Sequence, residues 1–100
     1  MPKINMTIPQ SLGQAEATRR LQQAAEAAKT QYAGQFSDLH EEWNGSTGTV
    51  SLKAAGFNVS VQFQVTDTSV DVVADVPMML LPFKGQVEQM INERAAVLFA

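Results

Sequence analysis

The chain of 100 residues contains no cysteine and a single histidine. Without cysteine there is no disulfide, no thiolate nucleophile and no cysteine-ligated zinc, a composition that suits a reducing compartment. His40 and Glu42 are two residues apart, but a structural zinc site needs about four ligands and no second histidine is present. We therefore interpret His40 as a solvated surface residue and expect no metal or other cofactor.

Basic residues are also scarce. Seven lysines and arginines stand against ten aspartates and glutamates, which gives a net charge of −3. Only Arg19 and Arg20 are adjacent, and adjacent residues on a helix point to different sides. Because a nucleic-acid-binding protein needs a basic face for the phosphates, we expect no nucleic acid among the partners.

Long hydrophobic runs are missing. The longest apolar stretch, residues 76–83, is too short to span a membrane and contains two prolines. The first five residues have no apolar run, so we expect no signal peptide and a cytoplasmic location. The apolar fraction of 45% and the charged fraction of 17% are typical of a globular protein, and this length predicts one domain over residues 1–100.

Catalytic motifs are absent from the sequence as well. There is no nucleophile elbow, phosphate-binding loop or dinucleotide-binding fingerprint. Asp67, Asp71 and Asp75 lack the spacing of a calcium-binding loop. Glu41 and Glu42 would point to opposite faces of a strand, which argues against a paired-carboxylate active site. We therefore expect that the protein is not an enzyme.

Alternating apolar and polar residues predict five strands. The clearest is 57–65, where Phe and Val alternate with polar residues, as in an antiparallel sheet with one solvated face. Similar alternation predicts strands at 4–8, 39–43, 50–54 and 70–76. The Asn44-Gly45 pair predicts a tight hairpin with positive φ at both residues, and Ala55-Gly56 predicts a second turn.

Three- and four-residue spacing predicts two helices. For the first, Ser11 and Gln14 would form a capping box, and the helix would end near Gly34 or Ser37. For the second, Pro82 would occupy the first turn. The apolar stripe of the first helix comprises Ala17, Leu21, Ala24, Ala25, Ala28, Tyr32 and Phe36. The stripe of the second comprises Phe83, Val87, Met90, Ile91, Ala95, Leu98 and Phe99.

The predicted fold class is α+β. The element order is β-α-β-β-β-β-α, and an antiparallel meander sheet would carry both helices on one face. This order resembles a reduced helix-grip fold, the class used by START-type lipid-binding proteins. The likeness suggests a small lipid or acyl-ligand binder as an alternative function, with a groove lined by Phe57, Val61, Phe63, Val87 and Ile91. At this chain length we expect these side chains to fill the space themselves.

An ordered set of residues resembles the polyhydroxyalkanoic acid system family. It comprises Ser11-Leu12-Gly13, Glu16-Ala17, Trp43, Gly45, Gly56, Leu80-Leu81-Pro82-Phe83-Lys84-Gly85, Val87-Glu88 and Ile91, and spans about residues 3–99. The chain departs from the pattern at Asn58, where the family often has a second glycine, and at 75–77. The resemblance implies a bacterial, cytoplasmic, non-enzymatic accessory protein that binds a polyhydroxyalkanoate granule, a granule protein or a second copy of itself.

Six apolar residues are candidates for an interaction surface. They are Met78, Met79, Leu80, Leu81, Phe83 and Trp43. The first four occupy a short connection that must cover the corner between sheet and helix, so closure of the core is the simpler interpretation. If they are exposed instead, they mark a contact with a partner, a second copy or a granule. Trp43 has the same two interpretations, as a core residue or as an exposed aromatic anchor.

Overall fold

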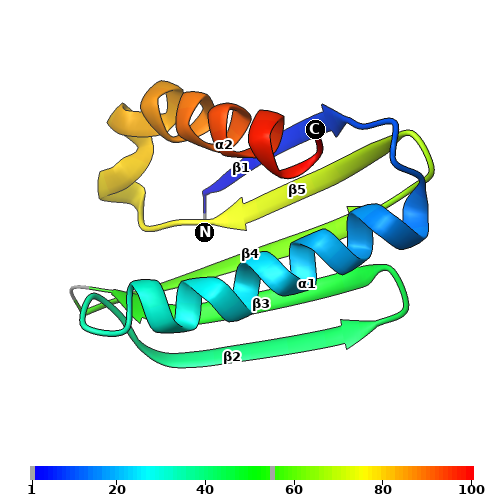
Figure 1. Cartoon of the computed structure of the whole chain (residues 1–100). Coiled ribbons are helices and arrows are strands. Elements are labelled where there is room, and N and C mark those ends of the chain that lie inside the picture. The colour runs from blue at the N-terminus through cyan, green and yellow to red at the C-terminus, as the bar shows by residue number, and fades with distance from the viewer. Residues whose placement is uncertain (1, 55) are drawn as a thin grey trace.

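Five segments with alternating apolar and polar residues pair into one open antiparallel sheet, and both helices cover the same face of it (Figure 1). The computed structural model describes residues 2–54 and 56–100. The elements are β1 (Lys3–Pro9), α1 (Gln14–Gln31), β2 (Ser37–Asn44), β3 (Thr47–Ala54), β4 (Phe57–Val65), β5 (Ser69–Asp75), the 3-10 helix η1 (Met78–Phe83) and α2 (Lys84–Leu98). The predicted fold class and element order are therefore confirmed.

The strand order across the sheet is β1-β5-β4-β3-β2, with every neighbouring pair antiparallel. Strands β2 to β5 form the predicted meander, and β1 returns to pair with β5. The register places alternate residues of each strand under the helices. One such row runs across the whole sheet as Met6, Val72, Phe63, Gly48 and Trp43.

The β2–β3 hairpin turns one residue later than the sequence predicts. Asn44 still pairs with Thr47, so the two loop residues are Gly45 and Ser46. Gly45 has a φ of 62°, whereas Asn44 is not among the residues with positive φ. A glycine with positive φ at the first loop position is the pattern of a type II′ turn. Asn44 is the last residue of β2 and is not one of the two loop residues. In the second predicted turn Gly56 has a φ of 82°, and Ala55 lies outside the described residues.

The start of α1 is fixed by residues distant in the sequence, and the predicted Ser11 capping box is wrong. Gly13 is the N-cap residue, and it has no side chain that could accept a hydrogen bond from the first turn of the helix. Instead, the carboxylate of Asp67 in the β4–β5 turn accepts a hydrogen bond from the Gln14 amide at 3.1 Å. Buried Gln10 donates to the carbonyl oxygens of Thr66 and Asp67 and accepts from the Leu12 amide.

The end of α1 and the start of α2 also differ from the prediction. Helix α1 ends at Gln31, earlier than Gly34 or Ser37, with Tyr32 as its C-cap residue. Pro82 lies inside η1, and α2 begins only at Lys84. The 3-10 helix accommodates Pro82, and the chain has fewer residues per turn through η1 than in the α-helix that follows.

The core lies between the sheet and the helices. Ala17, Val65 and Val70 are fully enclosed, and Ala95 and Phe99 of the α2 end join the same cluster. A smaller cluster under the start of α2 joins Ile4, Ala74 and Val76. Helix α1 lies over the β3–β4 side of the sheet and α2 over the β1–β5 side (Figure 1).

Candidate functional site

The corner segment, residues 78–83, exposes most of its apolar side chains. Met78 is 73% exposed, Met79 59% and Phe83 49%. Leu81 is exposed as well, and only Leu80 packs against the Ile4 cluster. The interpretation that residues 78–81 close the core is therefore wrong for Met78, Met79 and Leu81 and holds for Leu80 alone.

The helical geometry of the corner segment accounts for the exposure of Met78, Met79 and Leu81 around the inward-facing Leu80. A 3-10 helix has about three residues per turn, so one turn directs only about one side chain in three toward the sheet. The Leu80 amide donates to the Pro77 carbonyl oxygen and closes that turn. Phe83 was predicted to begin the apolar stripe of the second helix, but it precedes the first residue of α2 and faces solvent.

Trp43 belongs to a different part of the molecule. It lies on β2, at the sheet edge opposite β1, and its ring stacks on Phe63 with centroids 6.3 Å apart. The indole also covers Gly48, where an added Cβ would lie 2.5 Å from a ring carbon. Trp43 is half-buried on the face that carries the helices, as the core interpretation predicts, and is remote from the corner segment.

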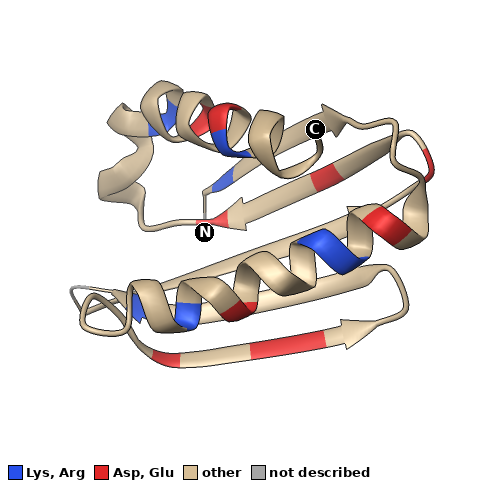
Figure 2. Ribbon diagram, viewed as in Figure 1, with Lys and Arg blue, Asp and Glu red and all other residues tan. Residues whose placement is uncertain are grey.

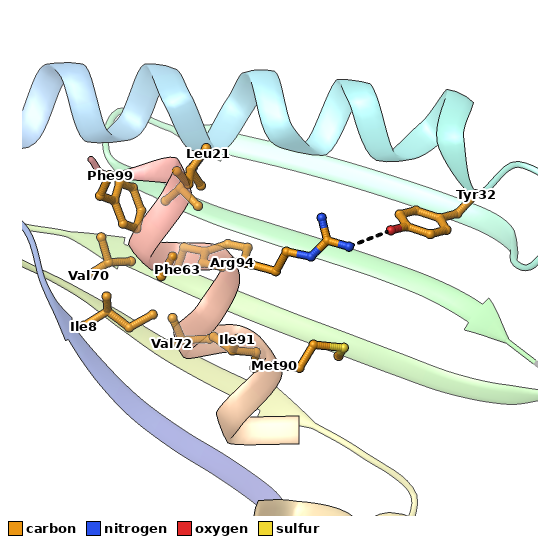
Figure 3. A pocket seen from close by; sticks show the side chains of 12 residues that line it. Ile8, Leu21, Tyr32, Phe63, Val70, Val72, Met90, Ile91, Arg94 and Phe99 are labelled. Atoms are coloured by element: carbon orange, nitrogen blue, oxygen red, sulfur yellow. Dashed lines mark hydrogen bonds between the residues drawn. The ribbon is translucent and has the colours of Figure 1, made fainter. Parts of the chain in front are cut away.

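An apolar groove of about 470 Å³ lies between α1 and α2 (Figure 3). Its floor is formed by β1, β4 and β5, where Ile8, Val70 and Val72 are buried and Phe63 is half-buried. The lining residues are Ile8, Leu21, Tyr32, Phe63, Val70, Val72, Met90, Ile91, Arg94, Ala95, Leu98 and Phe99. The expectation that side chains fill this space is wrong, because a groove of this volume remains open between them. Of the predicted lining residues, Phe63 and Ile91 are present, whereas Phe57, Val61 and Val87 do not contribute.

One end of the groove is polar. Arg94 extends from α2 toward Tyr32 just beyond the end of α1, and its Nη2 donates to the Tyr32 hydroxyl at 3.3 Å (Figure 3). Among the residues that line the groove, these two alone carry polar side-chain atoms. Our sequence interpretation missed Arg94. A signal was present, because Arg94 follows Met90 by four residues and Ile91 by three, which places a cation beside the apolar stripe.

The opposite end of the groove is held by a charged contact between the helices. Arg20 of α1 donates to the carbonyl oxygen of Leu98 at 3.0 Å and to the main-chain oxygen of Ala100 at 2.8 Å. Glu16 accepts hydrogen bonds from Arg19 and Arg20, which lower its pKa from 4.5 to about 2. A cation at the C-terminal end of a helix also interacts favourably with the helix dipole.

The remaining candidates for chemistry stay separate. His40 is exposed. Within residues 2–54 and 56–100, no group of three or more His, Asp or Glu side chains is arranged to hold a metal ion. The Asp71 carboxylate accepts a hydrogen bond from the Thr7 hydroxyl on the outer face of the sheet. Glu41 and Glu42 point to opposite faces, as predicted, and Glu41 lies 3.8 Å from Lys29 under α1.

Both helices carry acidic and basic residues, whereas β2 carries only acidic charges (Figure 2). The only adjacent basic residues are Arg19 and Arg20 on α1, in agreement with the small number of lysines and arginines. In the described part of the chain, no helix is both long and apolar enough to cross a membrane.

The sequence model of the family described as "Putative polyhydroxyalkanoic acid system protein" matches residues 4–99. The chain belongs to this family. The match covers the same span as the ordered residues noted in the sequence, so the predicted resemblance is confirmed. Membership associates the protein with the polyhydroxyalkanoate system. No curated protein and no solved structure matches the chain.

Proposed function

We propose that the protein is a non-enzymatic accessory protein of polyhydroxyalkanoate metabolism that binds the surface of the polyester granule. The observation that carries the proposal is the corner segment, where Met78, Met79, Leu81 and Phe83 are exposed together. Exposed apolar patches of this kind mark interaction surfaces in soluble proteins. Family membership supplies the setting in which a hydrophobic surface is available.

The shape of the corner segment suits an extended apolar surface. Leu80 anchors the segment to the sheet, while its neighbours project from a short 3-10 turn. Methionine side chains are flexible and polarisable, so they adapt to a surface without a fixed pattern of partner groups. A polyester surface has no such pattern, whereas a folded partner protein or a second copy would present one. For this reason we place the granule before these alternatives.

Fractionation of cells that accumulate the polyester tests this function. We expect the protein in the granule fraction, and we expect a Met78→Gln/Met79→Gln variant to move to the soluble fraction. A Phe57→Gln/Val97→Gln variant is the matched control, because it removes the same number of exposed apolar side chains outside both the corner segment and the groove. The proposal is abandoned if the wild-type protein stays soluble, or if both double variants remain on the granule.

The groove favours a second candidate function, the binding of a small acyl ligand. Its volume of about 470 Å³ falls within the range of small-molecule sites, and its walls are almost entirely apolar. The groove and the corner segment share no lining residue, so the two functions can be tested separately.

A further inference from the structure

The groove between α1 and α2 has an apolar body and one charged end, which is the distribution of an amphiphile. Ile8, Phe63 and Val72 form the floor, and Ile91 and Leu21 form the walls. The only charged group that lines it is the guanidinium of Arg94 (Figure 3). A ligand that fills this groove must therefore be apolar along most of its length.

Arg94 forms no ion pair with any residue in 2–54 or 56–100. The other arginines are paired with Glu16, and Lys29 is paired with Glu26. Among the described residues, the one hydrogen-bond partner of the Arg94 guanidinium is the Tyr32 hydroxyl, at 3.3 Å. The charge that complements this end of the groove is therefore negative.

A carboxylate fits this end by its geometry as well as its charge. The planar guanidinium has five N–H donors and binds a carboxylate through two parallel hydrogen bonds. The Tyr32 oxygen accepts one hydrogen bond from Arg94, which leaves its own proton free to donate to the same carboxylate. Arg94 lies on α2 and Tyr32 is the C-cap residue of α1, so an anion between them would also join the two sides of the groove.

We infer that this groove binds a free medium-chain carboxylic acid, with the acyl chain along the apolar floor and the carboxylate between Arg94 and Tyr32. The inference rests on the second candidate function and specifies its ligand class. It assigns Arg94 as the residue that selects the acid over a neutral compound of the same chain length. Met90, four residues before Arg94 on the same face of α2, is the exposed apolar rim beside the headgroup.

The test is a titration of the whole protein with decanoate below its micelle concentration. Trp43, the only tryptophan, reports binding by fluorescence because it stacks on Phe63 in the groove floor. We expect saturable binding of one molecule per chain. Shortening decanoate to octanoate removes two methylenes, so affinity should fall roughly fifteenfold if both are buried.

The variant Arg94→Gln tests the headgroup contact. Since Arg94 is exposed, we expect the fold to be unchanged and the decanoate affinity to fall roughly tenfold or more. Binding of decanol should be unaffected by the same substitution. Tyr32→Phe should weaken decanoate binding less. Lys84→Gln is the matched control, because it removes one positive charge from α2 outside the groove and should leave the decanoate affinity unchanged.

Two results would overturn the inference, and they are distinguishable. If decanol binds as tightly as decanoate and Arg94→Gln changes neither affinity, the carboxylate contact is wrong while acyl binding stands. If neither compound binds and light scattering shows a dimer, a second copy occupies the groove, and both the inference and the acyl-binding function are lost.

Discussion

Gly48 shows how one residue without a side chain can position a large one. Among the described glycines it alone has another side chain where its own Cβ would lie, and that side chain is the Trp43 indole. Because Gly48 pairs with Trp43 on one side and with Phe63 on the other, the two aromatic rings meet above it. A glycine inside a strand often marks such a close approach.

We expect Gly48→Ala to destabilise the protein by about 1–3 kcal/mol, the usual range for overpacking in a core. The physical reason is that the new methyl group would lie 2.5 Å from a carbon of the Trp43 ring. Urea unfolding followed by circular dichroism measures the change in the free energy of unfolding. In a Trp43→Val background the same substitution should be neutral or stabilising; an equal loss in both backgrounds would contradict the steric explanation.

At the scale of the elements, the two helices are joined by a chain of charged contacts rather than by a large apolar interface. Glu16 accepts a hydrogen bond from Arg20, and Arg20 donates hydrogen bonds to main-chain oxygens at the end of α2. These groups are accessible to water, so their contribution to stability depends on pH and salt. The pKa of Glu16, about 2, is lower than its unfolded value of 4.5.

A carboxyl group whose pKa is lowered by folding stabilises the native state above its unfolded pKa. The Glu16 contribution should therefore be complete above about pH 5 and should disappear as the pH falls through 4.5 toward 2. Glu16→Gln should lower the urea midpoint at pH 6 and have a smaller effect at pH 3. Glu26→Gln, which alters an exposed pair within α1, is the control. A difference between wild type and Glu16→Gln that is constant with pH would refute this assignment.

The elements show which parts of this fold could be predicted from sequence. Alternation over 57–65 gives β4 with its observed bounds, and the order from β2 to β5 follows from consecutive hairpins, whereas the pairing of β1 with β5 was not predicted. The start of α1 could not be predicted from local residues, since Asp67 and Gln10 fix it through contacts with a distant turn. The sequence suggested a groove as an alternative, but the expectation of a filled space was wrong, and so were three of its five lining residues. Its existence depends on which strands each helix covers, a tertiary property that the apolar stripes do not determine.

At the scale of the whole molecule, the sheet is open, and its β2 edge has features that discourage pairing with a further strand. The edge strand carries only acidic charges, and Asp38 has a φ of 54° beside a shift in the pairing register with β3. Glu41 points inward beneath α1, where its Oε2 is buried and accepts no hydrogen bond from the described residues. Inward-pointing charges and irregular edges both discourage the addition of a further strand.

We expect Glu41→Val to increase self-association, because it removes the buried charge and lengthens the apolar face at the β2 edge. Sedimentation velocity over a range of protein concentrations measures this change. Glu42→Val removes the same charge from the outer face of the same strand and is the matched control. If the two variants sediment alike, the inward direction of Glu41 has no special role in keeping the edge free.

The pairing of β1 with β5 also has a consequence for synthesis on the ribosome. The meander from β2 to β5 is built from consecutive hairpins, each of which can form as soon as its residues have emerged. Strand β1 must wait for residues 69–75 before its backbone finds a partner. During that interval Ile4 and Ile8, later among the core residues, remain uncovered in the nascent chain. Pro2 precedes β1 and Pro9 is its last residue, and both limit the pairing of this strand with other chains.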